Sequence, residues 1–237
     1  MNKKIIILSG DPNSVNSELI YKSWKKLNKP IRRKIILISN YNLLSKQFKK
    51  LKYSIGLVKI NKIDQNEKDN SLKILNIDLN FKDPFKVKKK SASSFIRNSL
   101  NLAHKIALDK RIKGIVNCAV NKNLLNKDNI GVTEYLAKKC NIINNTEVML
   151  IRGDKLSVVP LTIHIKLKDV TKKIRKKLII KKISSLVSNY KKIFKKKPKI
   201  GMLGLNPHNA EMRDNSEEKK IIKPSILSLK RKGINIS

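Results

Sequence analysis

Two histidines that follow extended apolar segments offer the clearest chemistry in this sequence. The segment 204–208, Gly-Leu-Asn-Pro-His, ends on an imidazole directly after a short apolar run, and Thr162 to His164 ends another such run. In α/β enzymes, strands hold ligands rigidly and the loops that follow present them to a cleft. The chain contains three histidines in all, so a pair placed in this way indicates a divalent-metal site.

Each imidazole also has a simpler interpretation. Alternation along the extended segment places Thr162 and His164 on one side, where His164 is either a ligand or a satisfied structural group. Asn206 and Pro207 stop the strand before His208 and turn its imidazole out at the carboxyl end, where open α/β sheets bind ligands. Two imidazoles leave the site incomplete, because a catalytic metal commonly has three protein ligands.

The third ligand is not evident from the residues. His104 falls within a helical pattern and is expected to be a partly exposed helix residue. Glu211 has three open roles: a ligand, a partner that orients His208, or a loop carboxylate. Cys118 and Cys140 are too far apart for a C-x-x-C pair, and the sequence holds neither a G-x-S-x-G elbow nor a cysteine beside a plausible base.

The loop 10–18, between a first strand and a first helix, lies where a phosphate group can meet helix amides. It lacks the glycines of a dinucleotide fingerprint or a P-loop. A turn of Asp, Asn and Ser residues that caps the helix explains the same composition. Both interpretations remain open at this point.

Apolar periodicity predicts alternating strands and helices. Strands are expected at 4–9, 33–39, 73–79, 114–117 and 199–203, and helices at 17–27, 41–51, 94–109, 133–139, 175–194 and 216–232. Gly153 and Asp154 separate two apolar runs, 147–151 and 156–161, which predicts a hairpin. Residues 234–237 look like the beginning of a further strand. The alternation indicates a layered α/β fold with a mainly parallel sheet.

The charge is extreme but evenly spread. A formal charge of +38, from 55 Lys and Arg against 17 Asp and Glu, would suit a polyanion. The chain is also rich in Ile and Asn, which share A/T-rich codons with Lys, so nucleotide bias explains the charge without selection for binding. The densest basic run, 171–199, has the pattern of an amphipathic helix with a solvated face. Nucleic acid is therefore not an expected partner.

The sequence also bounds the location of the protein. No segment approaches the roughly 18 apolar residues of a transmembrane helix, and Asp11 and Pro12 end the first apolar run before it reaches the length of a signal-peptide core. The two cysteines form no secreted-type framework. A cytoplasmic protein without a membrane partner is expected.

Four segments, in order, resemble the 4-hydroxythreonine-4-phosphate dehydrogenase family. They are Gly10-Asp11-Pro12 with Glu18-Leu19, Gly131 to Ala137, Thr162 to Ile165 with Leu167 to Val170, and Gly204 to His208 with Glu211 and Glu217-Glu218. The resemblance extends over essentially the whole chain, and its last segment is the most specific.

This resemblance implies a homodimer of two α/β lobes with a cleft between them, as in isocitrate and isopropylmalate dehydrogenases, here residues 1–130 and 131–237. It implies that His164 and His208 are two of three ligands of a divalent cation (Zn, Mg or Co), and that Thr133 contacts a phosphorylated hydroxy amino acid. It further implies NAD-dependent oxidation and decarboxylation of 4-phosphohydroxy-L-threonine to 3-amino-2-oxopropyl phosphate, in pyridoxal 5'-phosphate biosynthesis.

The sequence departs from the family pattern at several positions. Asn-Ser-Val-Asn at 13–16 replaces a Gly-rich run, and Val132 stands where the family has His before Thr133. After His208 a Gly-rich continuation is also replaced, so a different backbone path is expected, since non-Gly residues resist positive φ. Val132 leaves open a related dehydrogenase for threonate or erythronate phosphate. A basic nucleic-acid-binding protein on the same scaffold is the rival from another class.

The family continues past Ser237, into a segment with the third metal histidine and much of the NAD site. We therefore expect the chain to lack the C-terminal part of the family, as a fragment or a shortened relative, and to be inactive alone. An open sheet edge and an uncovered apolar surface are expected where the segment is missing.

Overall fold

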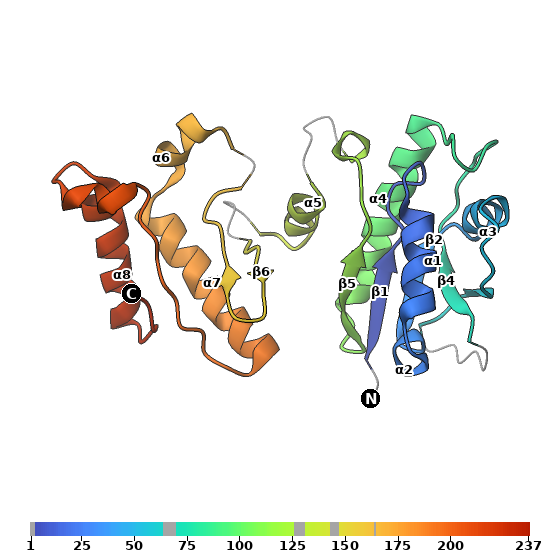
Figure 1. The fold of residues 1–237 in the computed structure, drawn as a ribbon, viewed down its shortest axis with the longest axis horizontal. Helices are drawn as coiled ribbons and strands as arrows, with labels where there is room; N and C mark the ends of the chain where they lie inside the picture. The colour runs from blue at the N-terminus through green and yellow to red at the C-terminus, as the bar shows by residue number, and fades with distance from the viewer. Residues whose placement is uncertain (1–2, 64–69, 126–130, 143–146, 164) are drawn as a thin grey trace. The chain divides into compact units, whose positions relative to one another are not determined.

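The computed structural model describes residues 3–63, 70–125, 131–142, 147–163 and 165–237. They form two compact units, Met1–Cys140 and Asn141–Ser237 (Figure 1). The boundary between these units falls ten residues beyond the predicted division at 130, because the helix at 132–139 packs on the first unit. Each unit has its own apolar core.

The first unit is built on a five-stranded sheet in which every pairing is parallel. Its strands lie in the order β3-β4-β2-β1-β5. Their bounds are Lys4–Leu8 (β1), Ile35–Ser39 (β2), Leu57–Ile60 (β3), Leu72–Asn76 (β4) and Ile112–Asn117 (β5). All five residues of β2 are buried, because a parallel strand with both faces covered is a continuous apolar run.

Helices cover both faces of this sheet (Figure 1). They are α1 (Asn16–Lys26), α3 (Tyr41–Lys50), α4 (Lys89–Ala107) and α5 (Val132–Lys139), with a 3₁₀ turn at Lys122–Leu124. The short helix α2 (Lys29–Arg32) precedes β2 and has no buried residue. Ile36 and Ile38 pack with Phe95 of α4, whereas Leu37 packs with the core residues of α1 and α3. Neighbouring residues of one strand thus supply two different cores.

The second unit is built on one long helix. Its elements are β6 (Ile151–Arg152), β7 (Ser157–Val158), a 3₁₀ turn at Leu167–Asp169, α6 (Val170–Lys173), α7 (Lys176–Phe194), a turn at Pro207–Met212, a π-helical segment at Glu218–Ile222 and α8 (Lys223–Arg231). Ile179 and Ile183 of α7 pack with Ile222 and with Leu229 of α8.

The structure confirms the predicted fold class of a mainly parallel sheet with flanking helices, and it confirms the hairpin between β6 and β7. Strand β3 was not predicted. The strand expected at 199–203 is reduced to a single parallel bridge between Ile200 and Ile236. Three hydrogen bonds support this bridge, including one from the amide of Met202 to the carbonyl of Ser237 at 2.8 Å. Leu203, which follows the bridge, is 86% exposed.

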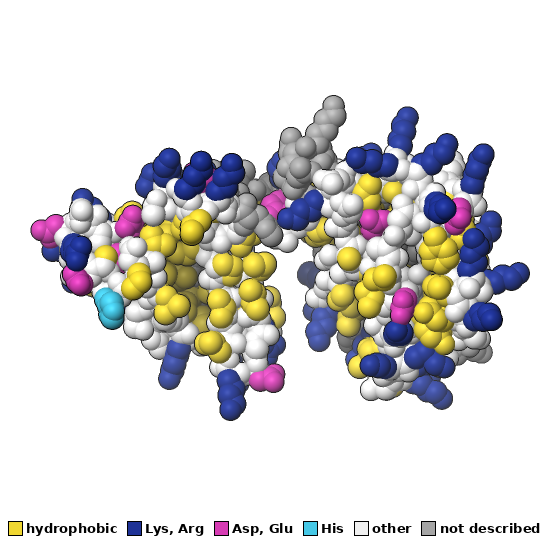
Figure 2. Space-filling view, turned by 45° about the horizontal axis from the view of Figure 1, so that its top comes forward, with side chains coloured by type: hydrophobic (Ala, Val, Ile, Leu, Met, Phe, Trp, Pro, Cys, Tyr) yellow, Lys and Arg dark blue, Asp and Glu magenta, His cyan; other side chains and the backbone are white. Residues whose placement is uncertain are grey.

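Lysine and arginine side chains are distributed around the visible face of each unit and do not gather in one patch (Figure 2). This agrees with their even spacing in the sequence. Among the helices of the described ranges, none has the length and apolar character needed to cross a bilayer.

One lysine of α7 departs from this surface pattern. Lys182 is only 2% exposed, beside Ile179 and Ile183 on the buried face of the helix. Burial lowers the pKa of Lys182 below its ordinary value, and the carboxylate of Glu147 opposes this shift. Burial of this side chain therefore disfavours its charged form.

We expect Lys182→Met to raise the free energy of unfolding by about 1 kcal/mol or more near pH 7, measured by urea unfolding. Because the folded state holds this proton less tightly than the unfolded state, wild-type stability should rise as the pH passes the folded-state pKa toward about 10.4. The difference in free energy of unfolding between the wild type and Lys182→Met should therefore become smaller as the pH rises. Lys181→Met, at the exposed neighbouring position, should be neutral; a destabilised Lys182→Met would contradict the prediction.

Candidate functional site

The first loop after β1 is closed against β5 by a glycine. Gly10 has a φ of +72°, and a Cβ there would press against the carbonyl of Ala119 and the side chain of Asn16. The amide of Asp11 and the Nδ2 group of Asn16 both donate to that same carbonyl, at 2.9 and 2.8 Å. Position 10 therefore needs both the conformational freedom and the small size of glycine.

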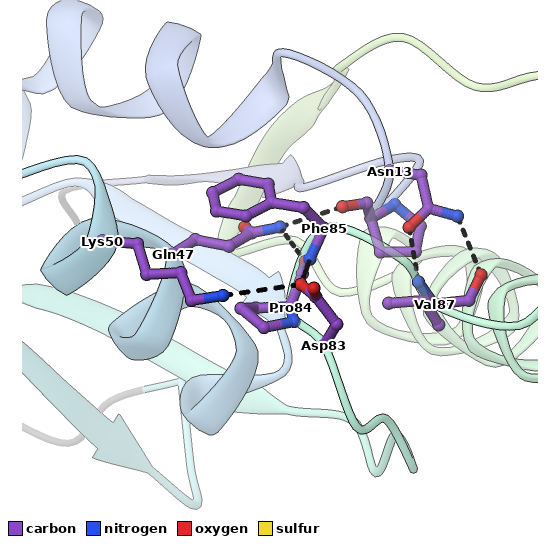
Figure 3. Close-up of polar contacts among 8 residues, drawn as sticks. Asn13, Gln47, Lys50, Asp83, Pro84, Phe85 and Val87 are labelled. Carbon is purple, nitrogen blue, oxygen red and sulfur yellow. Dashed lines mark hydrogen bonds and ion pairs between the residues drawn. The ribbon is translucent and has the colours of Figure 1, made fainter.

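The polar side chains of this loop form internal hydrogen bonds. Asn13 donates through Nδ2 to the carbonyl of Val87 at 2.9 Å and accepts from its amide at 2.8 Å, as a backbone partner would (Figure 3). The hydroxyl of Ser14 donates to the carbonyl of Asp11 and accepts from the amide of Asn16, the first residue of α1. The loop thus has a capping component, in line with the turn interpretation.

A buried amide of α3 joins this loop to a second one. Gln47 is 3% exposed, and its Nε2 group donates to the carbonyl of Pro12 at 2.9 Å and to that of Pro84 at 2.7 Å (Figure 3). Beside it, the amide of Phe85 donates to Asp83 and lowers the pKa of this carboxyl, with a smaller contribution from Lys50. The role of Gln47 was not predicted from the sequence, although a polar residue on an otherwise apolar helix face is a signal of a buried hydrogen-bonding group.

The cavity beside the loop is too small for a phosphate group. It has a volume of about 10 Å³ and is lined by residues that include Ser9, Asn16, Ser39 and Gln47. The Oδ1 atom of Asn16 is buried and, in the described part of the chain, has no hydrogen-bond partner. Such a volume holds about one water molecule, which an unpaired carbonyl oxygen would bind.

Thr133 lies at the start of α5. Its side chain is exposed, whereas that of Val132 packs against the core of the first unit. The hydroxyl of Tyr135 donates to Asn101 of α4 at 2.9 Å and fixes the helix there. The predicted substrate contact, Thr133, therefore faces solvent, while the residue before it, Val132, is directed inward.

His208 is exposed and belongs to a left-handed turn. Five consecutive residues, from His208 to Met212, have φ between 49° and 55°. The expectation that non-glycine residues would avoid positive φ here is wrong. Each such residue costs about 1–2 kcal/mol, so contacts outside the turn must hold it in place.

Glu218 holds the base of this turn. Its carboxylate, 3% exposed, accepts from the amides of Leu205 and Asn206, both at 2.9 Å, and from the Nδ2 group of Asn206 at 3.2 Å. Burial acts to raise the pKa of Glu218, but hydrogen bonds from the Asn206 amide and from other backbone amides outweigh it, so the pKa is lowered. The role of Glu218 was not predicted from the sequence.

The predicted metal site is described only in part. His164 lies outside the described residues, so its position relative to His208 is not known. Glu211 forms an exposed ion pair with Arg213 at 2.6 Å. Within the ranges that the structure describes, no three His, Cys, Asp or Glu side chains are grouped as metal ligands. The imidazole of His208 is therefore the single predicted ligand that can be placed.

The remaining candidates behave as the sequence predicts. His104 is half-buried in α4, as a partly exposed helix residue should be. Cys118 is a free thiol whose pKa is raised by burial, which disfavours the nucleophilic thiolate. Neither residue adds a reactive group to the site.

The fold and these residues define an α/β protein with a parallel sheet, a closed first loop and an imidazole on a left-handed turn. The family model described as pyridoxal phosphate biosynthetic protein PdxA matches residues 31–237. The chain belongs to this family.

Individual relatives agree with the family match. A 4-hydroxythreonine-4-phosphate dehydrogenase from Aquifex aeolicus is 33% identical over all of this chain and 73% of its own length. A candidate D-threonate 4-phosphate dehydrogenase from Oceanobacillus iheyensis is 29% identical over all of this chain and 74% of its own length. The crystal structure of 4-hydroxythreonine-4-phosphate dehydrogenase from Klebsiella pneumoniae shares the fold, with a TM-score of 0.82 and 19% identity over 99% of this chain and 74% of that one.

The strain in the left-handed turn can be tested at Ala210, whose φ is 49°. We expect Ala210→Gly to raise the free energy of unfolding by about 0.5–1 kcal/mol, because glycine adopts positive φ without a steric penalty. Chemical denaturation measures this change. Ala137→Gly, in the right-handed helix α5, should lower stability by about 1 kcal/mol, so equal losses from both substitutions would refute a left-handed turn.

Proposed function

We propose that the chain is an oxidoreductase of pyridoxal 5'-phosphate biosynthesis that acts on 4-phosphohydroxy-L-threonine. The proposed reaction oxidises the secondary alcohol with NAD and releases carbon dioxide to give 3-amino-2-oxopropyl phosphate. The match to the PdxA family over residues 31–237 carries this proposal, and the name of the Aquifex aeolicus relative supports the substrate.

Within the proposal, His208 and His164 bind one divalent cation. An exposed imidazole on a fixed turn suits Zn²⁺ or Co²⁺ better than Mg²⁺, which prefers oxygen ligands. Such a cation, when bound, would polarise the oxygen of the alcohol and then of the ketone. Thr133 would contact the substrate from the exposed start of α5. A homodimer and a cytoplasmic location complete the proposal.

The three histidines provide a test with an internal control. Titration of the purified chain with Zn²⁺ by calorimetry should give one site, whose affinity is weakened about tenfold or more in both His164→Gln and His208→Gln. His104→Gln changes the third imidazole, in α4, and should bind as the wild type does. Unchanged affinity in His208→Gln would overturn the metal site, whatever the result with His164.

A second candidate substrate is D-threonate 4-phosphate. It is favoured by the Oceanobacillus iheyensis relative and by Val132, which packs inward where the resembling family has histidine. NADH formation with each substrate, at equal concentration and in the presence of Zn²⁺, separates the two, measured both on this chain and on the chain extended by a relative's C-terminal segment. If the first proposal is right, 4-phosphohydroxy-L-threonine should be turned over faster. Faster turnover of D-threonate 4-phosphate would replace the first proposal with the second.

A further inference from the structure

Glu218 is 3% exposed, carries a carboxylate and accepts hydrogen bonds from three N–H donors. The two backbone amides share one oxygen, Oε1, and the Asn206 side chain donates to the same oxygen at 3.2 Å and to Oε2 at 3.4 Å. In the described residues, no lysine or arginine lies within ion-pair distance of this carboxylate. Its nearest basic neighbour in the sequence, Lys219, pairs with Asp214. The charge is therefore stabilised by N–H dipoles from the loop before His208.

These donors come from the residues that lead into the strained turn. Asn206 is two positions before His208, and Pro207 restricts the backbone between them. Gly204 is in close contact as well, because a Cβ there would collide with the side-chain oxygen of Asn209. The turn thus folds back on its own base, and Glu218 holds that base by hydrogen bonds that span 12 and 13 residues.

Ser216 forms hydrogen bonds at the other end of the turn. The amide of Ser216 donates to the carbonyl of Arg213 at 3.0 Å, and the Ser216 hydroxyl accepts from the amide of Lys219 at 3.2 Å. Ser216 is 5% exposed. His208 lies in the segment between Asn206, which Glu218 holds, and Ser216.

We infer that Glu218 is a positioning residue, whose buried carboxylate fixes the base of the left-handed turn and thereby sets the orientation of the His208 imidazole. The functional consequence rests on the proposed role of His208 as a metal ligand. The positioning itself does not, because it concerns the loop in the absence of any cation. Glu217, the adjacent half-buried carboxylate, offers a matched control of the same charge and size.

Hydrogen exchange and NMR on the metal-free chain test the positioning. In Glu218→Ala the amides of Leu205 and Asn206 should exchange about tenfold faster or more, and the imidazole signal of His208 should broaden or split while that of His104 stays sharp. Glu217→Ala should change neither signal. Wild-type exchange rates and a sharp His208 signal in Glu218→Ala would overturn the inference.

Two further variants separate geometry from folding. Glu218→Gln keeps an oxygen at the position that receives all three donors and should preserve protection, whereas Glu218→Asp keeps the charge but is one methylene too short and should lose it. Both can be compared even if Glu218→Ala does not fold. The opposite result would be retained amide protection in Glu218→Asp and lost protection in Glu218→Gln. It would show that the charge of residue 218, and not the position of its oxygen, protects these amides, and it would refute the inferred positioning role.

The consequence for binding is measured by Zn²⁺ titration of the His208 imidazole signal. We expect the affinity to fall about 10- to 100-fold in Glu218→Ala, as for other groups that orient a ligand, and to be restored in Glu218→Gln. If the wild type shows no Zn²⁺ response at His208, the proposed metal function fails. The exchange comparison then still decides the role of Glu218.

Discussion

Backbone groups in the loops that follow strands and apolar runs have no ladder partner, and the structure depends on buried side chains to satisfy them. Gln47 donates to the backbone carbonyls of Pro12 and Pro84, and Asn16 donates to the backbone carbonyl of Ala119. Glu218 accepts from two amides in the second unit. Each of these side chains is at most 3% exposed. A buried polar group left unpaired costs about 1–3 kcal/mol, so these few contacts determine the loop conformations.

Much of the fold could be predicted because the parallel strands are buried on both faces. Continuous apolar runs such as β1 and β2 stand out from the polar loops around them. Strand β3 escaped prediction because it is a four-residue edge strand with an exposed Lys59. The strand predicted at 199–203 has the right composition, but its described partner is a single bridge near the end of the chain. Apolar composition alone therefore does not reveal how many partners a strand has.

The sequence predicted the residue types of the candidate site but did not predict its backbone conformation. Local rules identify His208 as an imidazole after an apolar run, and they argue against positive φ at the residues that follow. The turn adopts positive φ nevertheless, and the residues at its base are held by Glu218 from 12 and 13 residues away. A contact over that separation leaves no periodic signal in the sequence. The paired glutamates were visible, but which of them is buried depends on the packing of the π-helical segment.

The first loop shows why some departures from a glycine-rich pattern are tolerated. Of the described residues in this loop, Gly10 has positive φ, and it also lies against the carbonyl of Ala119. Residues 13–16 all have negative φ, so side chains are allowed there, and Asn13 uses its side chain to pair with Val87. Glycine is therefore not needed at these positions, where the backbone is in an ordinary region. The need for glycine at position 10 follows from its φ and its close contact with Ala119.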